Sequence, residues 1–323
     1  MRKLFRFLFR VLGVIAILAA LVAAYIWFFG RPTCEKTLPT QLANLQAPRD
    51  TAHLIRGQNI AEMMCKHCHM NDAGTNLSGK NIVDLPKQFG TISSYNITND
   101  PTIGIGKWSD GELYWFLRTG KRKSGIVNSI MPTMPHASED DILSIITWLR
   151  SDDPTLQAAT DEVKPNDWNF FMRFLGIVAL KPLELPAKPI AAPDTTNTVA
   201  WGKYLADDLI SCYACHSADF STNNISEPSK SGGYYAGGNQ MPNLVGEIVS
   251  TANITPDPET GIGNWTKEQF RNATKNMIKP DGTPLVYPMV PHSALSDSEI
   301  DAIYAYLKTI PPVKNAVKRY KHG

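Results

Sequence analysis

The longest apolar stretch of the chain covers residues 11–29, and it contains no charged side chain. Four basic residues precede it: Arg2, Lys3, Arg6 and Arg10. About twenty apolar residues suffice for a helix to cross the hydrocarbon core of a bilayer, and a basic flank stays on the cytoplasmic side. A cleaved signal peptide has a shorter apolar core and a small-residue cleavage site, whereas this stretch ends in the aromatic-rich segment 25–29. We therefore predict a retained transmembrane anchor over residues 1–31, with the remainder of the chain exported.

Beyond the anchor, apolar residues recur at the spacing of helices with one buried face, i, i+3, i+4 and i+7. They are Ile142, Ile145, Ile146 and Leu149 in one stretch, and Ile300, Ile303, Tyr304 and Leu307 in another. A hydroxyl residue followed three positions later by Glu, Gln or Asp is typical of a helix start. Four such starts occur, at Ser109, Ser138, Thr266 and Ser296. Strands are hard to find, so the pattern predicts an all-α fold.

These helix signals belong to an internal repeat. Residues 96–108 begin with Asn-Ile-Thr and end with Gly-x-Gly-x-Trp, and residues 253–265 do the same in register without a gap. The repeat predicts two tandem domains of one kind, at 51–153 and 196–315. A proline-rich connector, 154–195, joins them.

One segment of the connector, residues 168–180, is apolar but too short and too charged to span a bilayer. We expect it to pack against one or both domains, with insertion into the membrane interface as the alternative.

Composition narrows the function only slightly. The 323 residues fit about two domains, and the net charge of +2 gives no reason to expect a nucleic-acid partner. No nucleophile–base pair or phosphate-binding loop stands out. The function must therefore be inferred from individual motifs rather than from composition.

Each domain carries one Cys-x-x-Cys-His pentad, at residues 65–69 and 212–216. This is the attachment signature of c-type haem: the two thiols add across the haem vinyl groups and the histidine ligates the iron. The pentads predict two haem c groups, attached through Cys65, Cys68, Cys212 and Cys215 and ligated by His69 and His216. Structural zinc is the alternative, but it needs four ligands that converge on one metal, and the pairs lie in separate repeats. We expect His67 to be a solvent-facing spacer.

The second axial position of each iron separates an electron carrier from a catalyst. A methionine there closes the coordination sphere and raises the potential. In the second domain Met289 lies seven residues before the cap of the last helix. In the first domain Met131 lies seven and Met134 four residues before the equivalent cap, so the spacing favours Met131, with Met134 as the alternative. His136 and His292 share these loops as alternative ligands, and a plain core role for the methionines is also open.

Together with the closing segment 303–312, these motifs resemble class I cytochrome c domains. They are most similar to the membrane-anchored cytochrome c subunits of periplasmic alcohol, aldehyde and gluconate dehydrogenases. The resemblance covers about residues 55–153 and 196–315, and it implies that Met131 and Met289 are the distal iron ligands. Those subunits commonly carry three pentads, whereas this chain has two.

We therefore expect a di-haem c-type cytochrome, tethered to the bacterial inner membrane with its haem domains in the periplasm. It would carry electrons to or from redox partner proteins (a dehydrogenase, a soluble cytochrome or an oxidase) or quinone, and would not be an enzyme on its own. The alternative is a di-haem redox enzyme, of the peroxidase or thiosulfate dehydrogenase type, with one open or unusually ligated haem. A methionine in both loops favours the carrier.

Overall fold

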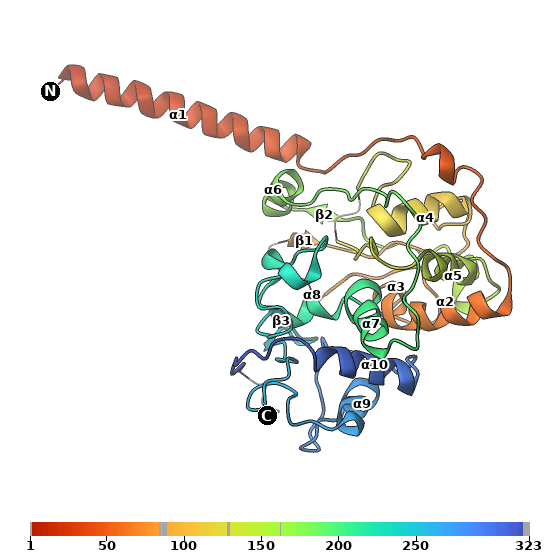
Figure 1. The fold of residues 1–323 in the computed structure, drawn as a ribbon. Helices are drawn as coiled ribbons and strands as arrows, with labels where there is room; N and C mark the ends of the chain where they lie inside the picture. Colours follow the sequence, from red (N-terminus) through yellow and green to blue (C-terminus); the bar gives the residue numbers. More distant parts are fainter. Residues whose placement is uncertain (1, 84, 86–88, 128–129, 162, 319–323) are drawn as a thin grey trace.

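Figure 1 shows one long helix that projects from a body of shorter helices. The computed structural model describes residues 2–83, 85, 89–127, 130–161 and 163–318. The long helix is α1 (Arg2–Phe29), and its side chains are almost all exposed. Within the described part of the chain, α1 is the one helix long and apolar enough to cross a membrane. It contains the whole apolar stretch from which the anchor was predicted.

The first domain packs α2 (Thr51–Met64) against α5 (Glu139–Leu149), with α4 (Asp110–Thr119) beside α5. A Cβ atom on Gly57 of α2 would lie 1.9 Å from the carbonyl oxygen of Ser144 in α5. Only glycine allows the two helices to approach so closely. The short elements of this domain are η1 (Thr40–Leu42), α3 (Lys66–His69) and η3 (Pro154–Leu156).

The second domain repeats this arrangement. Here α7 (Thr198–Lys203) packs against α10 (Asp297–Leu307), and α10 also contacts α9 (Lys267–Asn276). A Cβ atom on Gly202 of α7 would lie 1.8 Å from the carbonyl oxygen of Ala302 in α10. Gly202 precedes its pentad by ten residues, whereas Gly57 precedes its own by eight. A π-helical turn that continues α7, η4 (Tyr204–Leu209), accommodates this difference in spacing. The further elements are η4 (Tyr204–Leu209), α8 (Cys212–His216), η5 (Phe220–Thr222) and η6 (Pro228–Lys230).

All four predicted helix starts are N-caps in the structure. Ser109, Thr266 and Ser296 each accept a hydrogen bond from the backbone of the third helical residue, whose side chain accepts one in return. Ser138 accepts from the backbone of Asp141 without a bond in return, and its hydroxyl also accepts from Tyr204 over 3.1 Å. The predicted apolar faces are buried in both closing helices, except that Tyr304 is half-buried and its hydroxyl donates to the carbonyl of Trp265.

The fold is mainly helical, but the expectation of an all-α chain is too strict, because two short antiparallel pairs are present. Strand β1 (Gly90–Thr91) pairs with β2 (Asp167–Trp168), and β3 (Gln240–Pro242) pairs with β4 (Ile248–Ser250). Two or three residues leave no room for the alternation by which a strand is recognised in a sequence. The β1–β2 pair ties the connector to the first domain, and the connector then forms α6 (Phe170–Val178) beside the end of α1 (Figure 1).

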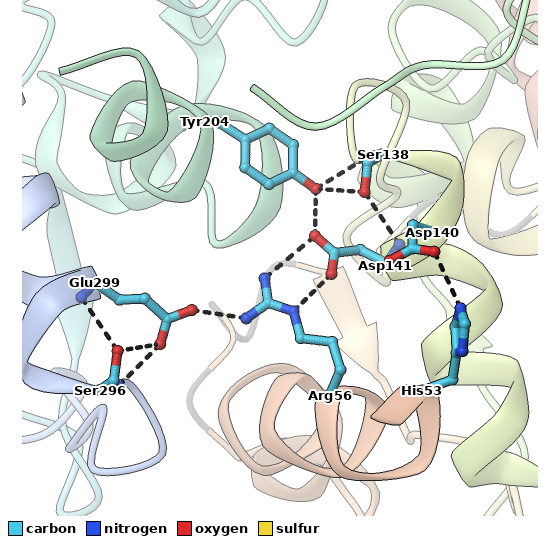
Figure 2. Close-up of polar contacts among 8 residues, drawn as sticks. All are labelled: His53, Arg56, Ser138, Asp140, Asp141, Tyr204, Ser296 and Glu299. Carbon is cyan, nitrogen blue, oxygen red and sulfur yellow. Dashed lines mark hydrogen bonds and ion pairs between the residues drawn. The ribbon is translucent and has the colours of Figure 1, made fainter. Parts of the chain in front are cut away.

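The two domains share one continuous apolar core and a polar contact at their interface (Figure 2). Arg56 of α2 donates to Asp141 at the start of α5 over 2.7 and 3.2 Å, and to Glu299 at the start of α10 over 2.7 Å. The hydroxyl of Tyr204, from the second domain, donates to Asp141 as well. Asp141 and Glu299 are equivalent residues of the repeat, each third after its cap, so one arginine joins the same point of both domains.

Candidate haem sites

Both pentads lie on short helical turns. Cys65 ends α2, and α3 carries the remainder of the first pentad, while α8 is formed by the whole of the second. On a helix, residues three and four positions apart lie on one face, so each turn brings its second cysteine and its histidine beside its first cysteine. None of the five cysteines forms a disulfide. Burial, with a smaller contribution from nearby charge, raises the pKa of Cys65 and of Cys212 to about 12, so both thiols are neutral before a haem is attached.

The histidine of each pentad is held by a backbone carbonyl. In the first domain Nδ1 of His69 lies 2.7 Å from the carbonyl oxygen of Tyr95, and in the second Nδ1 of His216 lies 2.8 Å from that of Ala252. A carbonyl can only accept, so Nδ1 carries the proton and the lone pair is on Nε2, the form that ligates a metal. Burial lowers the pKa of both imidazoles, which favours this neutral form.

The Asn-Ile-Thr repeats build the support for those carbonyls. Tyr95 directly precedes Asn96, whose side-chain oxygen accepts from the backbone of Thr98 over 2.8 Å and whose amide donates to the carbonyl of Ala159 over 2.7 Å. In the second domain Ala252 directly precedes Asn253, which makes the same two kinds of contact, with Thr255 over 3.0 Å and with Val313 over 2.7 Å. Sequence reasoning found the repeat but not this role. The sequence offered one signal for this role: in both domains the repeated segment begins directly after the residue whose carbonyl contacts the pentad histidine.

The loops that carry the candidate distal ligands have the same backbone register. The backbone N–H of Met134 donates to the carbonyl of Leu117 over 2.8 Å, and that of His292 donates to Thr274 over 2.9 Å. Leu117 and Thr274 are equivalent, since each is eight residues after the cap of its helix. Met134 therefore corresponds to His292, and Met131, three residues earlier, corresponds to Met289.

Burial also separates the two methionines of the first loop. Met134 is 4% exposed and belongs to the core, whereas Met131 is half-buried and packs at the edge of that core. The loop is fastened by Arg118, a fully buried residue of α4 whose Nη1 donates to the carbonyls of Met134, Pro135 and Ala137.

The alternative ligand histidines make other contacts. Nδ1 of His292 lies 2.9 Å from the carbonyl oxygen of Val290, and Nε2 of His136 lies 3.0 Å from that of Ile225. Burial lowers the pKa of His292, and His292 in turn contributes to the lowered pKa of His216. The second loop therefore lies close enough to the pentad histidine of its domain to act on it electrostatically.

The residues around the pentads fit a haem. Each domain offers two thiols and a neutral imidazole with an oriented lone pair, the donor set of covalent haem attachment. Some buried donors also find no partner among the described residues: Nε and Nη2 of Arg118 in the first domain, and Nδ2 of Asn239 in the second. An unpaired buried donor is destabilising by about 1–3 kcal/mol, and the carboxylates of a haem are acceptors that would relieve it.

A buried carboxylate distinguishes the second domain. Asp207, on the π-helical turn η4, accepts from the hydroxyls of Tyr234, Tyr235 and Tyr306 over 2.6–3.0 Å and pairs with Lys203 over 3.1 Å. Besides burial, its charge contributes to the raised pKa of Cys212. Sequence reasoning missed it because its tyrosine partners are 27 to 99 residues away. A negative charge thus lies beside the second pentad.

His67 is not the solvent-facing spacer that the sequence predicted. It is half-buried, and its Nε2 lies 3.1 Å from the hydroxyl oxygen of Tyr287, with the two rings 5.4 Å apart. Tyr287 belongs to the second domain and lies two residues before Met289. The contact joins the first pentad to the candidate ligand loop of the other domain, and only the packing of the two domains creates it.

Two family models match the chain, one in each predicted domain. Residues 199–311 match the family described as cytochrome c, and residues 52–149 match cytochrome c oxidase, cbb3-type, subunit III. The chain is built from two cytochrome c domains. Each holds one haem c, in agreement with the pentads and with the match to a diheme cytochrome c-type protein.

Curated relatives match most of the chain. It is 28% identical over 288 residues to the cytochrome c subunit of the alcohol dehydrogenase (quinone) of Gluconacetobacter polyoxogenes, a match that covers 84% of this chain and 59% of the relative. It is 30% identical over 287 residues to the gluconate 2-dehydrogenase cytochrome c subunit of Pantoea cypripedii, covering 83% and 62%. A diheme cytochrome c-type of Cereibacter sphaeroides is 28% identical over 308 residues, covering 90% and 95%. The chain thus spans about 60% of the two dehydrogenase subunits and nearly all of the di-haem protein.

Proposed function

We propose that this protein is a membrane-tethered di-haem cytochrome that carries electrons on the periplasmic side, with a dehydrogenase as the donor. The observation that carries the proposal is the repeated site: in each domain a pentad histidine is aligned by the carbonyl before an Asn-Ile-Thr motif. The dehydrogenase is proposed because relatives are named as cytochrome c subunits of alcohol and gluconate dehydrogenases. A soluble cytochrome, an oxidase or quinone remain the predicted acceptors.

The chain's own residues would divide the work at each site. We propose Cys65, Cys68, Cys212 and Cys215 as the attachment points, His69 and His216 as proximal ligands, and Met131 and Met289 as distal ligands. The common register of the two loops and the core position of Met134 support the choice of Met131. A bound haem supplies one-electron redox chemistry at its iron. The protein's part is to keep both axial ligands fixed, so that little rearranges when the charge changes.

The interface supports electron transfer between the haems of one chain. The domains share an apolar core, Arg56 joins both, and His67 contacts Tyr287 between one pentad and the other ligand loop. Two domains held this way keep a constant separation.

A flash-photolysis experiment tests the carrier proposal. The purified full chain, oxidised, is reduced by a pulse of photogenerated flavin semiquinone, and the haem absorbance is followed afterwards. A carrier shows a second phase, independent of protein concentration, as the electron equilibrates between haems. This phase must vanish in the single-haem variants Cys65→Ser/Cys68→Ser and Cys212→Ser/Cys215→Ser, which serve as controls. Its absence from the unsubstituted chain would refute transfer between the haems.

An absorption spectrum tests the ligands and the enzyme alternative. A pyridine haemochrome assay should count two haems per chain, and both should show the methionine–iron charge-transfer band when oxidised. One high-spin or bis-histidine haem would instead support the di-haem enzyme.

A further inference from the structure

We propose that α6 lies in the membrane interface as a second contact with the bilayer, and that it holds the first domain against the lipid surface. The proposal rests on the membrane tether of the proposed function, because α6 is positioned by the end of α1. The segment packs against the first domain, as the sequence predicted, and the proposal adds a membrane contact on the opposite side of the helix.

The helix α6 is docked on the last turn of α1 (Figure 1). Nη1 of Arg173 donates to the carbonyl of Trp27 over 2.9 Å, and its guanidinium lies 4.7 Å from the centre of the Trp27 ring. A Cβ atom on Gly176 would lie 2.1 Å from the carbonyl oxygen of Gly30, so the two backbones touch. The position of α6 along the axis of α1 is therefore fixed.

That position coincides with the end of the candidate span. Residues 11–29 extend for about 28 Å at 1.5 Å per residue, close to the roughly 30 Å of a hydrocarbon core. If α1 spans the bilayer, Trp27 and Phe29 lie at the boundary between acyl chains and headgroups. A helix that contacts Trp27 and Gly30 lies at the same depth.

The two sides of α6 differ in what covers them. Met172 and Gly176 face inward, and Met172 packs with Ile92 and Trp168 in a small core of the first domain. The opposite side is exposed and wholly apolar. It consists of Phe170, Phe171, Phe174 and Val178, which are 41–51% exposed.

At 100° per residue these four side chains fall within an arc of about 100°, one continuous stripe. An exposed stripe of three phenylalanines marks an interaction surface. Basic residues are close to these segments in the sequence: Arg31 follows α1, Arg173 lies on α6 and Lys181 lies just beyond it, as expected near phosphate headgroups.

The occupant that the geometry favours is lipid rather than a protein partner. In Figure 1 α6 is seen almost end-on while α1 runs across the view, so α6 runs across the axis of α1. Such a helix lies in the plane of the membrane whenever α1 crosses it, with one face in the acyl boundary and the other on the protein. Figure 1 places α2 and α5 of the first domain farther along the direction of α1 than α6, so these two helices would face away from the bilayer.

Spin labels test this placement in the full chain, reconstituted into nanodiscs of phosphatidylethanolamine and phosphatidylglycerol with both haems reduced. In a Cys34→Ser background, single labels are attached at Phe174→Cys on α6, at Leu18→Cys in α1, and at Ile55→Cys, an exposed apolar position of α2. Power saturation compares collisions of each label with oxygen, which concentrates in lipid, and with a water-soluble nickel chelate. We expect the oxygen-to-nickel ratio at position 174 to exceed that at position 55 several-fold.

The other outcomes are distinct. A lipid-like ratio at position 18 with a water-like ratio at position 174 would overturn the interfacial helix and leave the tether intact. A water-like ratio at position 18 would refute the tether itself. Shielding of position 174 from both probes would mean that a protein surface covers α6, which also overturns the proposal. A photoactivatable phospholipid provides a measurement without substitution: it should crosslink to residues 168–180 of the wild-type chain, and crosslinks confined to α1 would contradict the proposal.

Discussion

Replacement of Arg56 by methionine should weaken both the first domain and its attachment to the second. The guanidinium is 23% exposed and makes three charged hydrogen bonds, two to Asp141 and one to Glu299, whose side chains are 5% and 14% exposed. Burial lowers the pKa of Arg56, but the two carboxylates outweigh it and leave the pKa raised, so the residue is a permanent cation. Methionine keeps much of the volume and removes the charge.

The expected loss is set by the carboxylates that remain. Removal of one partner from a buried ion pair destabilises by about 3–5 kcal/mol, because the other charge stays buried without compensation. For a chain of this size, with about 2–4 °C per kcal/mol, the midpoint of thermal unfolding should fall by roughly 6–20 °C. Tyr204→Phe is the matched control: Asp141 loses one hydroxyl but keeps Arg56, so the loss should be about 1–2 kcal/mol.

A double-mutant cycle measures how much of the lost free energy of unfolding comes from the contact between the domains. Glu299→Gln removes the charge that Arg56 contacts, and its amide oxygen can keep the capping contact with Ser296. Its coupling to Arg56→Met therefore measures the Arg56–Glu299 contact, expected at about 1–3 kcal/mol. Far-ultraviolet circular dichroism of the oxidised holoprotein during guanidinium unfolding gives each free energy. If Arg56→Met stayed within about 1 kcal/mol of the wild type, the buried ion pair would not hold the interface, and the reasoning would be refuted.

Four further substitutions test the sites and the pH dependence. Met131→Ala should abolish the methionine–iron band of one haem, whereas Met134→Ala should keep both bands and destabilise the core by about 2–5 kcal/mol; the reverse pattern would make Met134 the ligand. Asp207→Asn removes a negative charge beside the second haem attachment, so one of the two reduction potentials should rise in a redox titration and the other should not move. Burial lowers the pKa of His53, but its ion pairs with Asp50 and Asp140 outweigh this and leave it raised. Its stabilising effect is therefore complete below about pH 6.5 and fades as the pH rises through the folded-state pKa. The difference in thermal midpoint between wild type and His53→Gln should accordingly shrink from about pH 6 to about pH 9. A difference that stayed constant over this range would contradict the ion pairs.

Local signals in the sequence were sufficient for the elements that depend on neighbouring residues. Helix starts such as Ser109 and Thr266 are read correctly because a cap and its partner lie three residues apart. Both pentads lie on helical turns, and the apolar stretch 11–29 lies within one long helix. In each case the physical cause lies within a few residues of its effect.

Features that depend on the packing of distant segments were not predictable in this way. Arg56 and Glu299 are 243 residues apart, and either one alone looks like a surface charge. The carbonyl that aligns His69 belongs to Tyr95, and a backbone acceptor leaves no mark in a sequence. The segment that forms α6 has apolar residues on every side and a single charge, Arg173, so its composition could not tell which side the protein covers.

The two repeats differ in sequence where the domains contact each other, and this difference makes the surroundings of the two haem sites unequal. Arg56 and Trp201 are equivalent residues, and they meet at the interface, with the guanidinium 5.8 Å from the ring centre. A symmetric pair of arginines would place two cations together beside Asp141 and Glu299, whereas one arginine and one tryptophan give a single cation that both carboxylates share. The pentads are likewise unequal, since His67 reaches across to Tyr287 while its counterpart, Ala214, has no side chain long enough to do so. The first pentad therefore contacts the ligand loop of the second domain, and no equivalent contact can run the other way. A change in that loop should thus be felt at the first haem site, so the two sites are not equivalent despite their common fold.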